Sequence, residues 1–121
     1  MCAAETTAVA APLSTASRLE SPRRIGVLGG MFDPVHLGHT GAARFVQQAL
    51  GLEKVVLVPC GNPVHRQPPQ ASAPERCAMV ALAIAGEPSL QLDNRECRTH
   101  AASYTVDTIV ALRAAQPGTS W

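Results

Sequence analysis

GGMFDPVHLGH, residues 29–39, is the stretch on which the interpretation of this chain depends. It follows a short apolar run, residues 25–28, and precedes a segment with helical spacing, residues 40–50. A glycine turn and a helix N-terminus both present backbone N–H groups without internal partners, and the helix dipole adds positive charge there. Two imidazoles on the first helical turn, those of His36 and His39, can add donors to the same anion. The stretch therefore predicts a phosphate-binding site between a strand and a helix.

The composition favours a single domain that binds a small ligand. The chain has 121 residues, of which 46% are apolar, and this is enough for one domain with a core. Ten basic and nine acidic side chains give a formal net charge of +1, so the sequence lacks the broad basic footprint of proteins that bind polymeric nucleic acid. No apolar run approaches the roughly 20 residues that cross a bilayer. We therefore expect neither a nucleic-acid polymer nor a membrane among its partners.

The cysteines and the N-terminal residues bear on location and domain organisation. Four cysteines lie far apart without a C-x-x-C pair: Cys2, Cys60, Cys77 and Cys97. This spacing argues against a zinc knuckle and gives no disulfide framework, so we expect reduced thiols and a cytoplasmic protein. Residues 1–22 are rich in Ala, Ser and Thr, with Glu5 where a secretory signal carries basic charge. We interpret them as a disordered extension that precedes one domain, residues 23–121.

Strand and helix patterns alternate through this domain. Continuous apolar runs predict strands at residues 25–28 and 55–58, and a short alternating run predicts another at 90–92. Helical spacing predicts helices over residues 38–50, from 73 to about 85, and from about 105 to 116. Ser72 and Glu75 have the spacing of a capping box at the start of the second helix. In the last helix the inward residues are expected to be Val106, Ile109 and Val110.

This alternation predicts an α/β fold, a Rossmann-like three-layer parallel sheet with right-handed crossovers. Ligands bind at the carboxyl ends of the strands in such sheets. The glycine–histidine stretch, the Pro-rich loop of residues 60–73 and the polar run of residues 93–100 each follow a strand. All three segments are therefore expected to meet at one edge of the sheet.

The motifs resemble those of a known family. GGMFDPVHLGH looks like the signature of the HxGH nucleotidylyltransferases. Residues 61–66, GNPVHR, resemble a loop that usually reads N-P-P-H-K, and Arg76 opens a helix at the expected distance. DNRE at 93–96 and SYTVDT at 103–108 resemble two further paired segments of the family. Together, over residues 24–116, these motifs are similar to those of bacterial nicotinate mononucleotide adenylyltransferase.

The resemblance implies an enzyme of NAD biosynthesis, a nucleotidyltransferase. It would transfer AMP from ATP to nicotinate mononucleotide by in-line displacement without a covalent intermediate, and so form deamido-NAD and pyrophosphate. By similarity the catalytic residues are His36 and His39, and Mg²⁺ accompanies ATP as the cofactor. The residues implied to bind ATP and its phosphates are Gly29, Gly30, Met31, Phe32, His36 and His39. Those implied to bind the substrate are Asn62, His65, Arg66 and Thr105.

Alternatives and departures remain at this stage. An HxGH transferase with another phosphorylated acceptor, or a nucleotide-binding module without catalysis, would carry some of the same residues. Met31 stands where the family commonly has Thr or Ser, and Val64-His65-Arg66 replaces the usual Pro-His-Lys. Among the plainer interpretations, Asp33 is a turn former that bonds its own backbone, and Glu96 forms a structural ion pair with Arg95 and Arg98.

Length is the larger departure from the family. Its members continue past Trp121 with further strands, helices and an ATP-binding motif, so we interpret the chain as the N-terminal half of such a domain, truncated and incomplete. The expected strand order puts the first strand in the centre, with the second and third on one side. Residues 25–28 would then form a bare apolar edge, which predicts self-association. We expect catalysis by this chain alone to be poor or nil.

Overall fold

The computed structural model describes residues 22–63, 67–99, 102 and 104–121, so the predicted N-terminal extension lies outside the described residues except for Pro22. In chain order the elements are β1 (Arg23–Gly30), α2 (Leu37–Ala49), β2 (Lys54–Pro59), α3 (Ala73–Ala83), β3 (Leu90–Leu92), the 3-10 helix η1 (Arg95–Arg98), α4 (Thr105–Ala115) and β4 (Thr119–Ser120). The bounds predicted from the sequence differ from these by a few residues. Within the described residues, no helix has both the length and the apolar character needed to cross a membrane.

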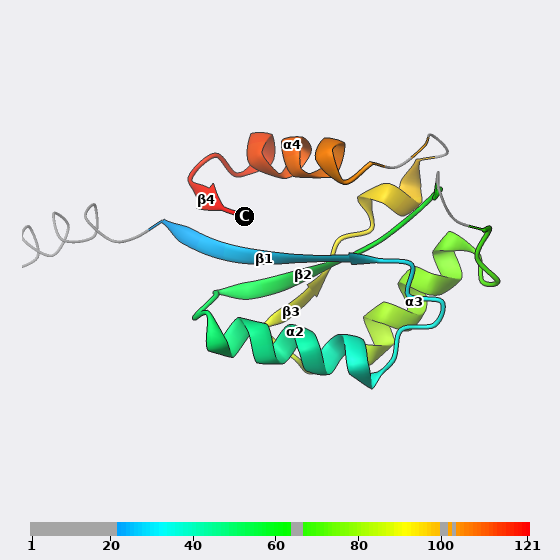
Figure 1. The fold of residues 1–121 in the computed structure, drawn as a ribbon, viewed down its shortest axis with the longest axis horizontal. Coiled ribbons are helices and arrows are strands. Elements are labelled where there is room, and N and C mark those ends of the chain that lie inside the picture. Colours follow the sequence, from blue (N-terminus) through cyan, green and yellow to red (C-terminus); the bar gives the residue numbers. More distant parts are fainter. Residues whose placement is uncertain (1–21, 64–66, 100–101, 103) are drawn as a thin grey trace, which may run out of the picture.

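The four strands form one parallel sheet in the order β3-β2-β1-β4. Helices α2 and α3 cover one face of the sheet, and α4 covers the other (Figure 1). The predicted three-layer parallel α/β architecture and the predicted strand order are therefore confirmed.

Strand β2 shows why the sheet has a core on both faces. Its side chains alternate, so that Val55 and Leu57 pack with Val80 of α3 in one apolar cluster. Val56 and Val58 point the other way and join Ile25 in a second cluster. A strand covered on both faces needs a continuous apolar run, and residues 55–58 supply it.

The helix boundaries follow the expected local signals. Ser72 caps α3, with its hydroxyl accepting from the Glu75 N–H at 3.3 Å while the Glu75 carboxylate accepts from the Ser72 N–H at 2.9 Å. Helix α2 ends before Gly51, whose φ of 61° lies in the left-handed region that glycine adopts without steric cost. Both the capping box and the glycine stop predicted from the sequence are confirmed.

The inward faces of two helices differ from the sequence pattern. In α4 the buried residues are Thr108 and Leu112, whereas Val106 and Val110 are more than 60% exposed, so the prediction of these valines as inward was wrong. Apolar residues occur all around α4, and spacing alone does not select a face. In α2 the large apolar residues Phe45 and Val46, which recur at helical spacing, are 71% and 41% exposed, whereas the buried residues are the smaller Thr40 and Ala43.

The β1 edge is partly covered. Strand β4 pairs with β1 in parallel, Thr119 opposite Arg23 and Ser120 opposite Arg24. Trp121 then packs against the cluster that contains Ile25 and Val27. The prediction of a bare edge over residues 25–28 is therefore corrected. Ile25 is buried and the cluster to which it belongs is covered by Trp121, while pairing with β4 reaches only Arg24.

Candidate phosphate-binding site

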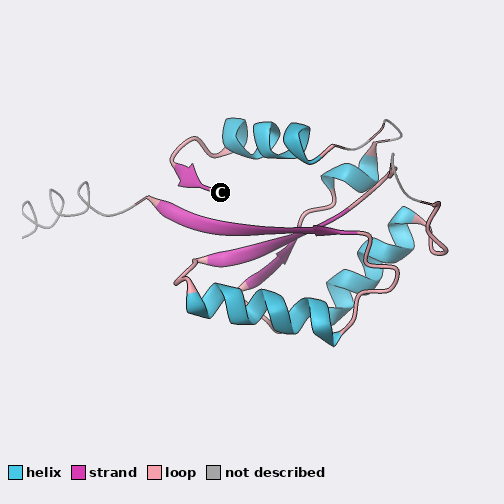
Figure 2. Ribbon diagram, in the orientation of Figure 1, coloured by secondary structure: helices cyan, strands magenta, loops and turns pink. Residues whose placement is uncertain are grey.

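The carboxyl ends of β1, β2 and β3 lie at the end of the sheet where α2, α3 and α4 begin (Figure 2). Parallel strands joined by right-handed crossovers impose this arrangement, because each helix must return the chain to the opposite end. The three segments that the sequence singled out therefore share one edge of the sheet, as predicted.

Two histidines form the cap of α2. His36 is the N-cap residue, and its Nδ1 accepts a hydrogen bond from the N–H of Gly38 at 3.1 Å. In return the N–H of His36 donates to Nδ1 of His39 at 3.1 Å. The two rings stack with their centroids 3.8 Å apart. The reciprocal pattern is that of a capping box, with imidazoles in place of the usual hydroxyl and carboxylate.

These bonds determine which ring nitrogen carries the proton. A nitrogen that accepts from a backbone N–H is unprotonated in the neutral ring, so both histidines carry their proton on Nε2. Burial, followed by the nearby charge of His36, lowers the pKa of His39 below its usual value. At neutral pH the His39 side chain is therefore neutral, and its Nε2–H lies across the ring from the helix and can donate to a ligand.

Gly38 is required by the close approach of the His36 ring. A Cβ at this position would lie 2.9 Å from both Cε1 and Nδ1 of His36. Any side chain there would displace the ring from the N–H that it caps. This contact gives a physical reason for the glycine in the H-x-G-H spacing.

The turn between β1 and α2 presents further donors. Phe32 is buried, with a φ of 51° that is uncommon for a residue with a side chain, and its ring meets that of His39 edge-on at 5.0 Å. Within the described part of the chain, the N–H groups of Met31 and Phe32 have no hydrogen-bond acceptor. The first turn of α2 contains no acidic residue that would occupy its positive end. The turn, the helix start and the two imidazoles together form a cluster of donors suited to an anion.

Asp33 connects this turn to the loop before α3. Its carboxylate accepts from the N–H of Gln70 at 2.7 Å and from that of Ala71 at 3.0 Å. The prediction that Asp33 bonds its own local backbone is corrected, because its partners lie 37 and 38 residues away. These two N–H bonds lower the pKa of the Asp33 carboxyl below its usual range.

Arg76 lies beneath the same turn and is fully buried. Its Nη1 donates to the carbonyls of Met31 at 2.8 Å and Cys60 at 2.7 Å, and its Nε donates to that of Ala71 at 3.1 Å. One guanidinium thus binds three segments: the turn after β1, the loop after β2 and the residues just before α3. Sequence reasoning used Arg76 only as a motif position and missed this role; an arginine in the first turn of a helix with an apolar face was the available signal.

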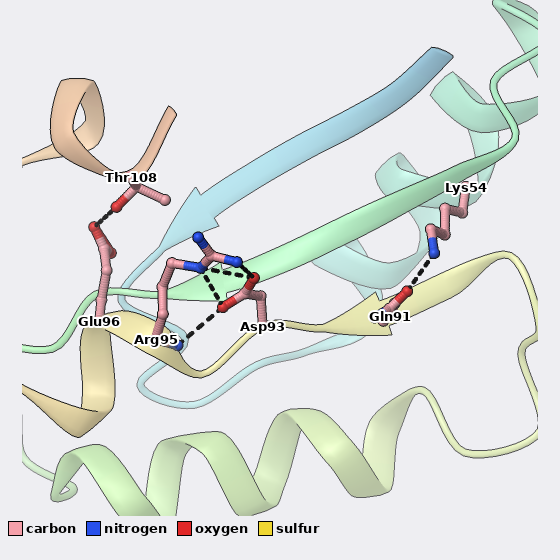
Figure 3. Close-up of polar contacts among 6 residues, drawn as sticks. All are labelled: Lys54, Gln91, Asp93, Arg95, Glu96 and Thr108. Atoms are coloured by element: carbon pink, nitrogen blue, oxygen red, sulfur yellow. Dashed lines mark hydrogen bonds and ion pairs between the residues drawn. The ribbon is translucent and has the colours of Figure 1, made fainter. Parts of the chain in front are cut away.

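The segment after β3 has one polar contact within itself and one with α4 (Figure 3). Arg95 pairs with Asp93, with Nη2 2.8 Å from Oδ2, and Glu96 accepts a hydrogen bond from Thr108 at 2.8 Å. The predicted ion pair of Glu96 is therefore corrected. Burial opposes ionisation of Asp93, but hydrogen bonds from Arg95 outweigh it and lower the pKa of Asp93. The Glu96 carbonyl also packs so closely on Gly61 that no Cβ fits there.

Comparison with known proteins shows the family to which the chain belongs. The sequence profile of the cytidylyltransferase-like family matches residues 27–116. The chain belongs to this family. Its relatives include proteins named probable nicotinate-nucleotide adenylyltransferase, so the resemblance predicted from the motifs is confirmed.

Three of these relatives show the extent of the match. The protein from Pseudomonas putida (strain GB-1) is 44% identical over 84% of this chain and 47% of its own length. Those from Bordetella pertussis and Hahella chejuensis are each 52% identical over 74% of this chain, and over 45% and 41% of their own lengths. The chain thus spans slightly under half the length of these curated relatives.

A solved structure shares the fold. Plasmodium falciparum nicotinic acid mononucleotide adenylyltransferase, complexed with NaAD, matches with a TM-score of 0.67 at 16% identity, over 80% of this chain and 48% of that one. At this identity the likeness shows the fold alone, and it agrees with the Rossmann-like sheet described above.

Four of the remaining predicted residues of this cytidylyltransferase-like chain are described by the structure. Gly29 and Gly30 end β1, Asn62 is exposed in the loop after β2, and Thr105 is the exposed first residue of α4. His65 and Arg66 lie outside the described residues. No group of three or more His, Cys, Asp or Glu side chains in the described residues is arranged to hold a metal ion.

Proposed function

We propose that this chain binds ATP with its Mg²⁺ and nicotinate mononucleotide, and transfers AMP between them to form deamido-NAD and pyrophosphate. The observation that carries the proposal is the pair of stacked imidazoles, each with its Nδ1 held by a backbone N–H and its Nε2–H available to a ligand. Phosphate oxygens are the ligands that such a cluster of hydrogen-bond donors beside a helix N-terminus binds best.

The chemistry requires alignment and charge stabilisation rather than a protein nucleophile. A phosphate oxygen of the mononucleotide forms a bond to the α-phosphorus of ATP as the bond to the β-phosphate oxygen breaks and pyrophosphate leaves. Negative charge spreads over the oxygens during this exchange, and preorganised donors stabilise it without reorganisation. His36 and His39, with the N–H groups of Met31 and Phe32, are the donors proposed for that role.

Magnesium would arrive as part of the substrate. The described residues offer no cluster that would hold the ion alone, and Mg²⁺ commonly binds nucleotides through phosphate oxygens with few protein ligands. When bound, it supplies positive charge to the oxygens of ATP. The Nε2–H groups of the two imidazoles contribute directed hydrogen bonds beside it.

The acceptor is proposed to bind between the loop after β2 and the start of α4. The N-cap residue of α4, Tyr104, makes no side-chain capping bond, so the hydroxyl and N–H of Thr105 can face a carboxylate. This arrangement suits the pyridine carboxylate of nicotinate mononucleotide. Asn62, His65 and Arg66 are proposed to contact the same substrate. Because ATP is the proposed donor, we place the reaction in the cytoplasm.

The test separates binding from turnover. We would titrate the chain with ATP·Mg²⁺ and with nicotinate mononucleotide by calorimetry, and assay deamido-NAD and pyrophosphate by chromatography. The informative variant is His36→Asn, because asparagine caps helices well and so keeps an acceptor at the position of Nδ1 while removing the donor at Nε2. Gln48→Ala, at an exposed position near the other end of α2, is the matched control.

We expect His36→Asn to weaken ATP binding by roughly tenfold or more, since a bond to a charged group contributes about 1.5–3 kcal/mol. Turnover, where it is measured, should fall by roughly 10²-fold or more. Binding without product would support the nucleotide-binding alternative, and product from another phosphorylated acceptor alone would support the related transferase. Unchanged binding in a folded His36→Asn chain would contradict the assigned site.

A further inference from the structure

Two cysteines that the proposed function does not use face each other behind the site. Cys77 lies on α3 and is 8% exposed, and Cys97 lies in η1 and is half-buried. Their sulfur atoms are 2.8 Å apart, and Sγ of Cys97 is also 3.6 Å from the carbonyl oxygen of Pro59. Both are free thiols in this structure, as the sequence predicted for all the cysteines.

The separation leaves little movement between the present contact and a covalent bond. A disulfide has its sulfur atoms about 2.05 Å apart, so the two side chains need to approach by roughly 0.8 Å more. The residues are 20 apart in sequence, and no local cysteine spacing indicates the pair. The sheet brings them together: η1 follows β3, and α3 precedes it.

We propose that Cys77 and Cys97 form a reversible redox pair, which low-molecular-weight disulfides such as glutathione disulfide convert to an intramolecular disulfide. In the first exchange one cysteine thiolate attacks the small disulfide, giving a mixed disulfide and one released thiolate. The other cysteine then attacks the protein sulfur of that mixed disulfide, forming the Cys77–Cys97 bond and releasing the second thiolate. Two protein thiols are oxidised and one small disulfide is reduced to two thiols, so atoms and electrons balance.

Exposure assigns the order of the two exchanges. Cys97 is the more accessible sulfur, so it meets the small disulfide first and Cys77 resolves the mixed disulfide from the buried side. Burial, followed by the hydrogen bond to Cys77, raises the pKa of the Cys97 thiol to about 12, with Arg76 acting against the shift and Glu96 adding to it. Because only the thiolate attacks, oxidation is expected to be slow at neutral pH and to accelerate up to tenfold for each added pH unit.

The bond would fix η1 to α3 beneath the loop after β2. Cys77 adjoins Arg76, whose guanidinium holds the carbonyls of Met31 and Cys60. Cys97 follows Glu96, whose carbonyl packs against Gly61 and whose carboxylate accepts from Thr108. A covalent link between these two residues therefore limits the separation of η1 from α3. Oxidation is expected to raise the melting temperature by roughly 10 °C.

The experiment uses the full chain, incubated with glutathione disulfide at pH 7 and pH 9, alkylated with iodoacetamide and digested with trypsin. The sequence suits this mapping, because the four cysteines fall in four different tryptic peptides. We expect residues 77–95 to become linked to residues 96–98, with a mass loss of two hydrogen atoms and faster formation at pH 9. The link should disappear on reduction with dithiothreitol. The inference does not depend on transferase activity.

Several results would overturn the proposal. A stable glutathione adduct on Cys97, a link that involves Cys60 or Cys2, or full alkylation of all four cysteines after prolonged oxidation at pH 9 would each do so. Cys60→Ser is the matched control, and the Cys77–Cys97 link should form in it at the wild-type rate. In Cys97→Ser, Cys77 should remain without glutathione. Because the mapping is done on wild-type protein, it remains decisive even where a variant does not fold.

Discussion

Replacing Arg76 by methionine should destabilise the fold severely. The change keeps much of the length of the side chain and removes a guanidinium that makes three bonds of 3.1 Å or less to the carbonyls of Met31, Cys60 and Ala71. A buried polar group left without its partner costs about 1–3 kcal/mol, and water entering the space recovers part of this. We therefore expect Arg76→Met to lower the free energy of unfolding by about 4 kcal/mol. This is a large part of the roughly 5–15 kcal/mol that stabilises a small domain.

Arg76→Lys separates charge from geometry. An ammonium retains the positive charge but is a compact group on a different stem, so it cannot reach all three carbonyls at once. We expect a loss of about 2 kcal/mol, between wild type and Arg76→Met, in urea unfolding followed by circular dichroism. The matched control is Arg113→Met on the exposed side of α4, which should stay within about 0.5 kcal/mol of wild type. An Arg76→Met cost below about 1 kcal/mol would refute the reasoning, as would an Arg76→Lys chain as stable as wild type.

Three further predictions concern other parts of the fold. Gly38→Ala should displace the His36 ring and lower the free energy of unfolding in urea by about 1 kcal/mol. Gly41→Ala in the same helix, where an added Cβ meets nothing within 4 Å, should raise it by about 0.5–1 kcal/mol. Equal effects of the two substitutions would contradict the close contact at Gly38. The pKa of the Asp33 carboxyl is lowered in the folded state, so this group stabilises the fold above pH ~4 and the stabilisation is lost on acidification. In Asp33→Asn the free energy of unfolding should therefore depend less steeply on pH below pH ~4. A pH dependence equal to that of the wild type would contradict this prediction. We also propose that the chain self-associates through β1, so amide hydrogen exchange of residues 25–30 should slow as the protein concentration rises. Equal slowing on the face of α2 that carries the exposed Phe45 would place the contact elsewhere.

The sequence predicted those features that depend on short-range pattern. The alternation of strands and helices led to the parallel sheet, because β2 carries its continuous apolar run and each helix has a recognisable start. The position of His36 and His39 at the entry of α2 was also visible, since a glycine turn and a helical stretch flank the motif.

The features that the sequence did not predict depend on contacts between distant segments. Asp33 bonds residues 37 and 38 positions away, and Arg76 reaches Met31 across 45 positions. The choice of the face that α4 buries is another example, because the burial of Leu112 and the bond from Thr108 to Glu96 determine it. Periodicity describes a helix surface but does not show which neighbour covers it.

The histidine cap of α2 has a consequence for the order of folding. Its two hydrogen bonds span only two and three residues, so they can form as the first turn of the helix forms, on the submicrosecond-to-microsecond scale of helix growth. The guanidinium bonds of Arg76 to Met31 and Cys60 close loops of 45 and 16 residues and must await docking of β1, β2 and α3. We therefore expect local structure to orient the imidazole donors before the sheet is complete. Partial denaturation should break the bonds of Arg76 to the turn while the two imidazole rings remain stacked at the start of α2.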